Sequence, residues 1–216
     1  MTPERFRRLS AALTRRQPDL TILMDRVHKS HNFSAILRSC DAVGVLEANV
    51  VATEDAVAIH HATSAGSKKW VGVRQHPSVE EAIGRLRKRG FKILAAHPSP
   101  GARDYRDVDY TAPTALTLGA ELRGLSHEAL ALADTHVTIP MVGLVQSLNV
   151  SVAAGLLLFE ASRQRSAAGL YERSRLPAEE FASRLFEWAY PTLARRRREA
   201  GRPYPALGRD GEILPD

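Results

Sequence analysis

Short apolar strands alternate with helical segments between residues 20 and 162, and this alternation is the feature that most restricts the fold. The predicted strands are LTILMDRV (20–27), ANVVAT (48–53), WVGVRQH (70–76), FKILAA (91–96), TALTLG (114–119) and HVTIPM (136–141). Helices are predicted over 33–43 and 78–89, from Ser126, and from residue 147. This order is typical of an α/β domain in which helices flank a mostly parallel sheet.

Three loops of such a domain are candidates for a binding site, because ligands of parallel sheets bind beyond the carboxyl ends of the strands. They are residues 96–100, 119–125 and 140–146. In LGAELRGLS (118–126), Glu121 follows the strand, and the flanking glycines allow a flat ligand such as adenosine to approach the backbone closely. The chain contains no P-loop motif, and no G-x-G-x-x-G follows the first strand, so neither site type is predicted.

The stretch IPMVGLVQSLNVSVAAGLLLFEA (139–161) changes from strand to helix around Gly143. Its helix is apolar on nearly every face, so we expect it to be covered on several sides. Ser147 and Asn149 are residue types that cap helices. A helix start that faces a pocket also suits a phosphate or carboxylate. The residues alone leave both interpretations open.

The segment HNFSAILRSCDAVG (31–44) has one apolar helical face and one polar face, and Arg38 and Asp41 lie on the polar face. Arg38 therefore has two interpretations. It either forms a surface ion pair with Asp41 or is a cation that faces a phosphate in a site. In the second interpretation, Asn32 caps the helix. Cys40 lies on the apolar face and is expected to be a buried thiol. His28, His31 and the pair His60–His61 lack companion ligands at metal-binding spacing, so no metal site is predicted.

The chain of 216 residues is long enough for one buried core with terminal extensions, predicted as residues 1–19, 20–162 and 163–216. It has no apolar run of ~20 residues and no signal peptide, so we expect a cytoplasmic protein. The net charge of +6 comes from the ends: basic residues exceed acidic ones by three in 1–20, by none in 21–162 and by three in 163–216. Arg-rich extensions favour a polyanion such as RNA as the partner, although helix faces with Arg–Glu pairs also explain them.

Taken together, NFSAILR, LGAELRGLS and IPMVGLVQSLNVSVAAGLLLFEA resemble, in order and spacing, the three signature motifs of the SPOUT class of S-adenosylmethionine-dependent RNA methyltransferases. With RRQPDLTILMDRVHKSHN before them and GLYER after them, the chain is similar to the TrmH type, which methylates the ribose 2′-hydroxyl of guanosine 18 in the D-loop of tRNA. The resemblance implies a C-terminal trefoil knot in residues 20–162, a homodimer, and S-adenosyl-L-methionine as the methyl donor.

The resemblance also implies residue roles. The catalytic neighbourhood comprises Asn32, Arg38, Glu121, Ser147 and Asn149; backbone around Ala96, Gly119, Ile139, Met141 and Leu148 holds the donor; and RNA is bound by Arg16, Arg163, Arg165 and Arg173. We expect Arg38 to bind a phosphate and stabilise developing negative charge, because a guanidinium stays protonated and is a poor general base. Two alternatives remain: methylation of ribosomal RNA or another tRNA position, and RNA binding without catalysis.

Overall fold

The computed structural model describes residues 1–51, 69–121 and 123–215. Contacts divide the chain into two compact units, one of residues 18–169 and one in which residues 1–17 join residues 170–216. The predicted boundary between 162 and 163 falls inside a helix of the first of these units.

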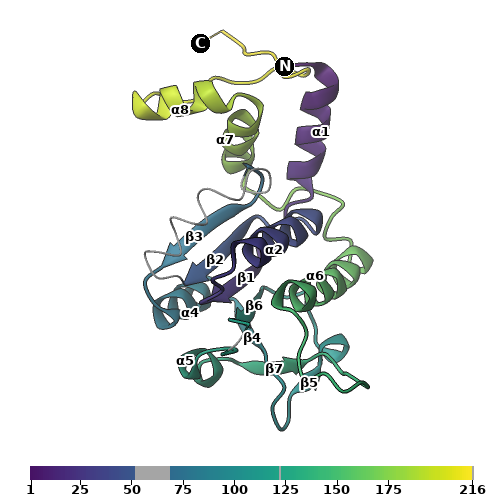
Figure 1. Ribbon diagram of the computed structural model, residues 1–216. Coiled ribbons are helices and arrows are strands. Elements are labelled where there is room, and N and C mark those ends of the chain that lie inside the picture. Colours follow the sequence, from purple (N-terminus) through teal and green to yellow (C-terminus); the bar gives the residue numbers. More distant parts are fainter. Residues whose placement is uncertain (52–68, 122, 216) are drawn as a thin grey trace. The chain divides into compact units, whose positions relative to one another are not determined.

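Residues 18–169 form an α/β unit whose elements follow the predicted alternation (Figure 1). Its strands are β1 (Leu20–Asp25), β2 (Glu47–Val51), β3 (Gly72–His76), β4 (Lys92–Ala96), β5 (Arg103–Asp104), β6 (Thr114–Gly119) and β7 (Thr135–Thr138). Its helices are α2 (Ser30–Ala42), α4 (Val79–Lys88), α5 (His127–Ala131), α6 (Val150–Ala167) and the short 3₁₀ helix η2 (Tyr105–Asp107). Strand β5 and helix η2 were not predicted, because each is only two or three residues long and carries no periodic pattern.

The seven strands of the described residues form one sheet in the order β3-β2-β1-β6-β4-β7-β5, and every neighbouring pair is parallel. The α/β class and the parallel sheet are therefore confirmed. Because all strands point the same way, the loops that follow β1, β4, β6 and β7 leave the same edge of the sheet. That edge is where the sequence places its motifs.

Two hydrophobic cores cover the two faces of the sheet. Ile22 and Met24 of β1 belong to the core beneath α2 and α6, whereas Leu23 belongs to the core beneath α4 and α5. This division follows from the two-residue period of a strand, which turns successive side chains to opposite faces. Figure 1 shows α2 and α6 side by side, and Cys40 is buried as predicted.

The other unit consists of α1 (Pro3–Thr14), α7 (Ala178–Ala189), α8 (Pro191–Glu199) and the C-terminal segment. Helices were predicted in both extensions, and the structure has α1 in the first and α7 and α8 in the second, with α8 beginning at Pro191. Tyr204 of the C-terminal segment stacks on Phe186 with ring centroids 4.9 Å apart, and the Tyr190 hydroxyl donates to the Gly211 carbonyl at 2.7 Å. Gly211 lies against Phe6 of α1, so the end of the chain is part of this unit's packing.

Candidate active site

Three of the predicted catalytic residues are joined by hydrogen bonds, although they come from three separate elements. Asn32 lies in α2, Glu121 follows β6, and Asn149 immediately precedes α6. The Asn32 side-chain amide donates to a Glu121 carboxylate oxygen, and the Asn32 carbonyl oxygen accepts from Asn149 Nδ2 at 3.2 Å. Asn32 is only 2% exposed, so its orientation is fixed by these two partners.

Asn32 does not cap its helix, contrary to the prediction. Helix α2 begins at Ser30, two residues earlier, and its N-cap Lys29 makes no side-chain capping bond. Asn32 therefore lies in the first turn, and its amide is available for Glu121 and Asn149. This buried amide therefore joins two polar partners from other elements instead of initiating the helix.

Asn149 caps a helix, as its residue type suggested, and it also bonds Asn32. It is the N-cap of α6, where its side-chain oxygen accepts from the Ser151 backbone N–H at 2.8 Å, while its Nδ2 reaches Asn32. The helix consequently begins at Val150 rather than at residue 147. Ser147 is left outside the helix with an exposed side chain, where it lines a pocket.

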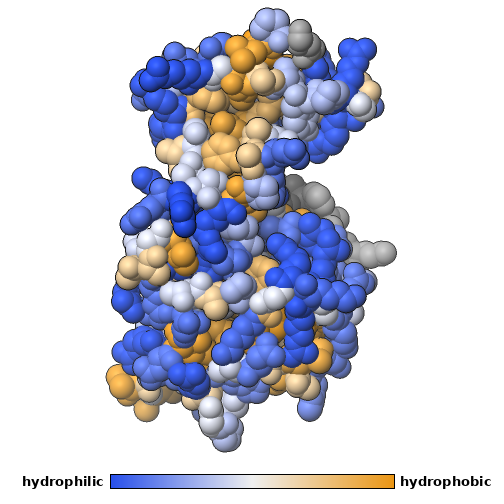
Figure 2. Space-filling model, turned by 180° about the vertical axis from the view of Figure 1, so that it is seen from behind, coloured by the Kyte–Doolittle hydropathy of each residue, from blue (hydrophilic) through white to orange (hydrophobic). Residues whose placement is uncertain are grey.

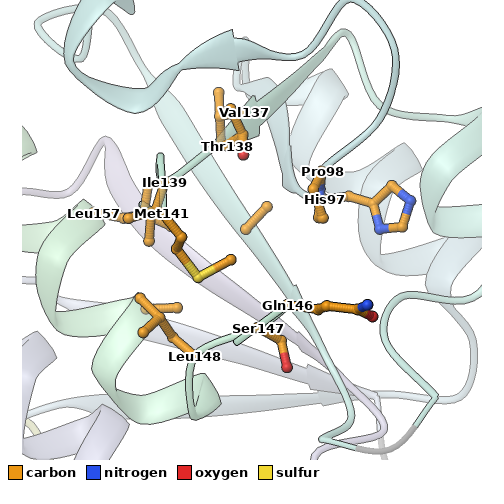
Figure 3. A pocket seen from close by; sticks show the side chains of 12 residues that line it. His97, Pro98, Val137, Thr138, Ile139, Met141, Gln146, Ser147, Leu148 and Leu157 are labelled. Atoms are coloured by element: carbon orange, nitrogen blue, oxygen red, sulfur yellow. The ribbon is translucent and has the colours of Figure 1, made fainter. Parts of the chain in front are cut away.

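This pocket, which we call the apolar pocket, lies beyond the carboxyl ends of β4 and β7, which pair through Ala96 and Val137 (Figure 3). Its lining residues are Ala96, His97, Pro98, Val137, Thr138, Ile139, Met141, Gln146, Ser147, Leu148, Ala153 and Leu157. Four of the five residues predicted to hold the donor are among them. In Figure 3, Ile139, Met141 and Leu148 gather on one side, and His97 and Gln146 lie on the other.

The chemistry of this lining fits a ligand with one flat apolar part and a few polar groups. Aliphatic side chains suit a purine ring, and Gln146, Ser147 and His97 offer hydrogen bonds to polar groups. His97 and Gln146 lie in two of the predicted candidate loops but were not named individually, and Thr138 was not predicted. The signal for them is their position: His97 directly follows β4, Thr138 ends β7, and Gln146 lies in the loop before α6.

Gly119 is the one predicted donor-binding residue that is not among the pocket's lining residues. It ends β6, where a Cβ atom would collide with the carbonyl group of Gly124. Ala120 and Gly124 exchange two backbone hydrogen bonds of 3.0 and 2.8 Å, and Gly124 has a φ of +64°. The glycines therefore allow the loop that carries Glu121 to fold tightly against the end of β6.

Arg38 lies exposed on α2. Within the part of the chain that the structure describes, its guanidinium forms no ion pair with Asp41 or with another carboxylate. The surface-pair interpretation is therefore not supported, and this cation is available to an external anion.

Two of the four arginines predicted to bind RNA are buried, so these predictions are wrong. Arg165 is 0% exposed and forms an ion pair of 2.7 Å with Asp19. Arg16 is 3% exposed, with its guanidinium over the Trp188 ring at 5.1 Å from the centroid. Both side chains are thus buried within the protein rather than presented at its surface.

The other two arginines are exposed. Arg163 bonds Glu160 through two hydrogen bonds of 2.7 and 2.9 Å, yet 67% of its side chain remains accessible. Arg173 lies in the segment between α6 and α7. Contacts of these two residues with RNA remain predictions.

No group of three or more potential metal-ligating side chains occurs among the described residues. His60 and His61 lie outside that range. No helix in the described segments is both long enough and apolar enough to span a membrane.

Two protein-family models match the sequence of this chain. The model of the SpoU rRNA Methylase family matches residues 19–159. These include the hydrogen-bonded residues Asn32, Glu121 and Asn149 and the apolar pocket. The chain belongs to this family. A second model, for the C-terminal region of SpoU rRNA methylases, matches residues 163–216. The TrmH and SPOUT resemblance of the three motifs is thereby confirmed.

Among the relatives is the tRNA (guanosine(18)-2′-O)-methyltransferase of Escherichia coli strain K12, which is 48% identical over 218 residues, covering 100% of this chain and 95% of the relative. The TrmH/SpoU tRNA modifying enzyme of A. aeolicus has a similar structure, with a TM-score of 0.81, 43% identity, and coverage of 88% of this chain and 97% of that one. The SpoU methyltransferase AviRb of Streptomyces viridochromogenes, in complex with the cofactor AdoMet, matches with a TM-score of 0.62 at 32% identity over 70% of this chain and 62% of its own.

Proposed function

We propose that this protein transfers the methyl group of S-adenosyl-L-methionine to the ribose 2′-hydroxyl of guanosine 18 in tRNA. One observation carries the proposal: the apolar pocket directly adjoins the Asn32–Glu121–Asn149 cluster, since Asn149 follows the pocket residue Leu148. The near full-length similarity to a guanosine 18 methyltransferase selects the substrate. AdoMet bound to a family member supports the identity of the donor.

The donor supplies an electrophilic methyl group on a sulfonium centre. Ile139, Met141 and Leu148 exclude water from the adenosine part, while Gln146 and Ser147 orient its polar groups. Asn32 holds Glu121 and Asn149 in fixed positions at the pocket's edge, where these polar groups orient the acceptor ribose.

Arg38 binds the phosphate beside the acceptor ribose and stabilises the negative charge that develops as the 2′-hydroxyl loses its proton. That phosphate or a water molecule takes the proton, because a guanidinium stays protonated at neutral pH. The exposure of Arg38 and its lack of an ion pair within the described residues fit this role.

We further propose that the segment from Gly143 to Asn149 is part of a trefoil knot and that the protein is a cytoplasmic homodimer. The sheet order, in which β4 lies between β6 and β7, is compatible with such a knot, and the family resemblance is what implies it. For the dimer, the support is an apolar surface on α6 and the loop before it. Its exposed members are Leu144, Val145, Val152, Leu156 and Phe159. A second copy of this chain covers such a surface, because monomers rarely expose contiguous apolar area.

The test is to incubate the purified protein with unmodified tRNA and ribosomal RNA and to map 2′-O-methylation in both. We expect one methylated position, guanosine 18 of tRNA, and a loss of at least ~100-fold in kcat for Arg38→Ala. Arg38→Lys keeps the charge but loses the two-pronged contact, so we expect it to be impaired as well. Full activity of Arg38→Lys contradicts the phosphate contact, and methylation only of ribosomal RNA contradicts the substrate.

A further inference from the structure

A second cavity lies next to the Asn32–Glu121 pair, and its lining is unlike that of the apolar pocket. The described residues that line it are Arg26, His28, Lys29, Ala120, Glu121, Arg123, Gly124, Leu125 and Ser126. They come from the loops after β1 and β6, which are neighbouring strands that pair Asp25 with Gly119. We call this cavity the cationic pocket.

Asp25, at the end of β1, fixes the backbone of the loop after β6 that lines the cationic pocket. This carboxylate is fully buried, accepts from the Ser126 backbone N–H at 2.7 Å, and thereby ties the loop after β6 to the end of β1. Its other oxygen lies 3.6 Å from Arg26 Nε, and Arg26 has a φ of +57°, a conformation that non-glycine residues rarely adopt. A left-handed arginine beside a buried carboxylate points to a function at this position.

The charges of the side chains that line the cationic pocket favour an anionic ligand. Arg26, Lys29 and Arg123 are basic residues, and the side chains of all three lie at the surface, that of Arg26 with 55% exposure. Glu121 is the one carboxylate among the described lining residues, and it already accepts from Asn32. Guanidinium and ammonium groups at the mouth of a cavity bind phosphate well.

The position of the cationic pocket relates it to the reaction. Glu121 lines it, Glu121 bonds Asn32, Asn32 bonds Asn149, and Asn149 follows Leu148 of the apolar pocket. One hydrogen-bonded cluster therefore separates a pocket for the donor from a pocket for an anion. An RNA chain whose ribose lies over that cluster carries a phosphate on each side of the ribose.

We propose that the cationic pocket binds a phosphodiester of the RNA that flanks the target nucleotide, through Arg26, Lys29 and Arg123. This inference rests on the proposed function. The pocket fixes the acceptor ribose from the side opposite the donor, and it is distinct from the contact of Arg38, which is not among the lining residues. Its cations act in substrate binding, so they govern KM for RNA rather than kcat.

The test compares Lys29→Ala/Arg123→Ala with wild type at saturating S-adenosyl-L-methionine, using an unmodified tRNA transcript. We expect KM for tRNA to rise about tenfold with kcat within about twofold, and the log–log salt slope of tRNA binding to fall by ~1 to 2. Affinity for S-adenosyl-L-methionine, measured by isothermal titration, should stay within about twofold. Lys29 makes no capping bond to α2, so its replacement does not remove a helix cap.

The matched control is Arg85→Ala/Lys88→Ala, which removes the same charge from α4, outside the cationic pocket. If the pocket variant and the control show the same KM and salt slope, the inference is overturned. Loss of donor affinity in the pocket variant also overturns it, because the cavity then belongs to the donor site. If wild type methylates no RNA, the proposed function fails instead. Single Lys29→Ala and Arg123→Ala variants with intermediate KM values keep the test valid if the double variant does not fold.

Discussion

At the scale of single residues, Arg165 shows how a charge in an Arg-rich segment becomes structural. Its guanidinium bonds the Asp19 carboxylate at 2.7 Å, the Tyr110 carbonyl at 2.8 Å and the Ala112 carbonyl at 3.0 Å. These partners precede β1 and β6, so Arg165 fastens the last turn of α6 to the starts of two neighbouring strands. The residue contributes to stability rather than to RNA affinity.

We expect Arg165→Met to lower the free energy of unfolding by about 3 kcal/mol, since removing one partner of a buried ion pair leaves the other uncompensated. Arg163→Met is the matched control on the same helix. Its exposed pair with Glu160 should contribute less than about 1 kcal/mol. Urea unfolding of both variants measures the difference, and equal effects contradict the assignment.

His76 belongs to a buried polar chain that crosses three strands. Its Nε2 lies 2.7 Å from Asn49 Oδ1, Asn49 Nδ2 donates to Thr21 Oγ1 at 2.9 Å, and Thr21 donates to the Glu47 carbonyl at 2.6 Å. Because burial disfavours the charged ring, the pKa of His76 is lowered from its ordinary value of 6.5. Among the charged groups that face His76, Glu81 and Glu47 raise the pKa, whereas Arg74 and Arg85 lower it.

The lowered pKa of His76 predicts that the protein loses stability in mild acid. Below pH 6.5 the unfolded chain binds a proton at this histidine more readily than the folded chain. The free energy of unfolding should therefore fall as the pH drops from about 6.5 towards the folded pKa, and it should be level above about 7. His76→Gln should flatten this part of the profile in urea titrations, whereas His127→Gln, at an exposed position of α5, should not. Equal slopes for all three proteins contradict the prediction.

At the scale of elements, α8 carries two kinds of arginine. Arg195 and Arg196 are exposed, whereas Arg197 donates to the Pro203 carbonyl at 3.1 Å and Arg198 to Glu187 at 3.2 Å. The segment after α8 packs on its own unit through Tyr204 and Gly211. Deleting residues 195–216 would remove this packing together with the charges, so substitution is the sharper experiment.

We expect Arg195→Gln/Arg196→Gln to weaken tRNA binding and to reduce the log–log salt slope by ~1 to 2, because each lost phosphate contact reduces it by about 1. Affinity for S-adenosyl-L-methionine should not change, since the apolar pocket lies in the other unit. Arg195→Lys/Arg196→Lys keeps the charge and should retain the slope. Fluorescence anisotropy of labelled tRNA over a salt series measures both. An unchanged slope in the glutamine variant means that α8 does not contact RNA.

At the scale of the whole molecule, apolar surface is distributed unevenly. The face shown in Figure 2 is largely hydrophilic with separate hydrophobic patches. Helix α6, in contrast, buries Val150, Ala154 and Leu157 but exposes Val152, Leu156 and Phe159. The sequence pattern, which is apolar on nearly every face, thus matches a helix that the rest of its own chain covers only in part.

We expect wild type to sediment at about twice the chain mass of 23.7 kDa at micromolar concentration, and Leu156→Glu/Phe159→Glu to sediment as a single chain. Charges in an apolar interface are left without partners, which disfavours association. Val73→Glu, which introduces the same charge at an exposed apolar position of β3, is the control and should remain dimeric. A wild-type species of one chain mass contradicts the proposed dimer.

The sequence by itself determined the kind and order of the elements and named candidate residues for the site. Strand and helix periods are local properties, so β6 was predicted with its observed ends and most other described elements within a few residues. Strand ends of a parallel sheet share one edge, so the loops after β4, β6 and β7 were expected to meet there. Asn32, Glu121 and Asn149 do meet, through hydrogen bonds that join residues 89 and 117 positions apart.

Only the tertiary structure decided which polar residues are buried and which face solvent. Arg163 and Arg165 are two positions apart in a basic segment, yet one is exposed and the other is enclosed by partners up to 146 positions away. Asn32 looked like a helix cap because its role depends on where Glu121 and Asn149 lie, which no local pattern encodes. Burial and hydrogen bonding are set by segments distant in the chain, so the sequence named candidate residues for the site, whereas the fold gave each one its contacts.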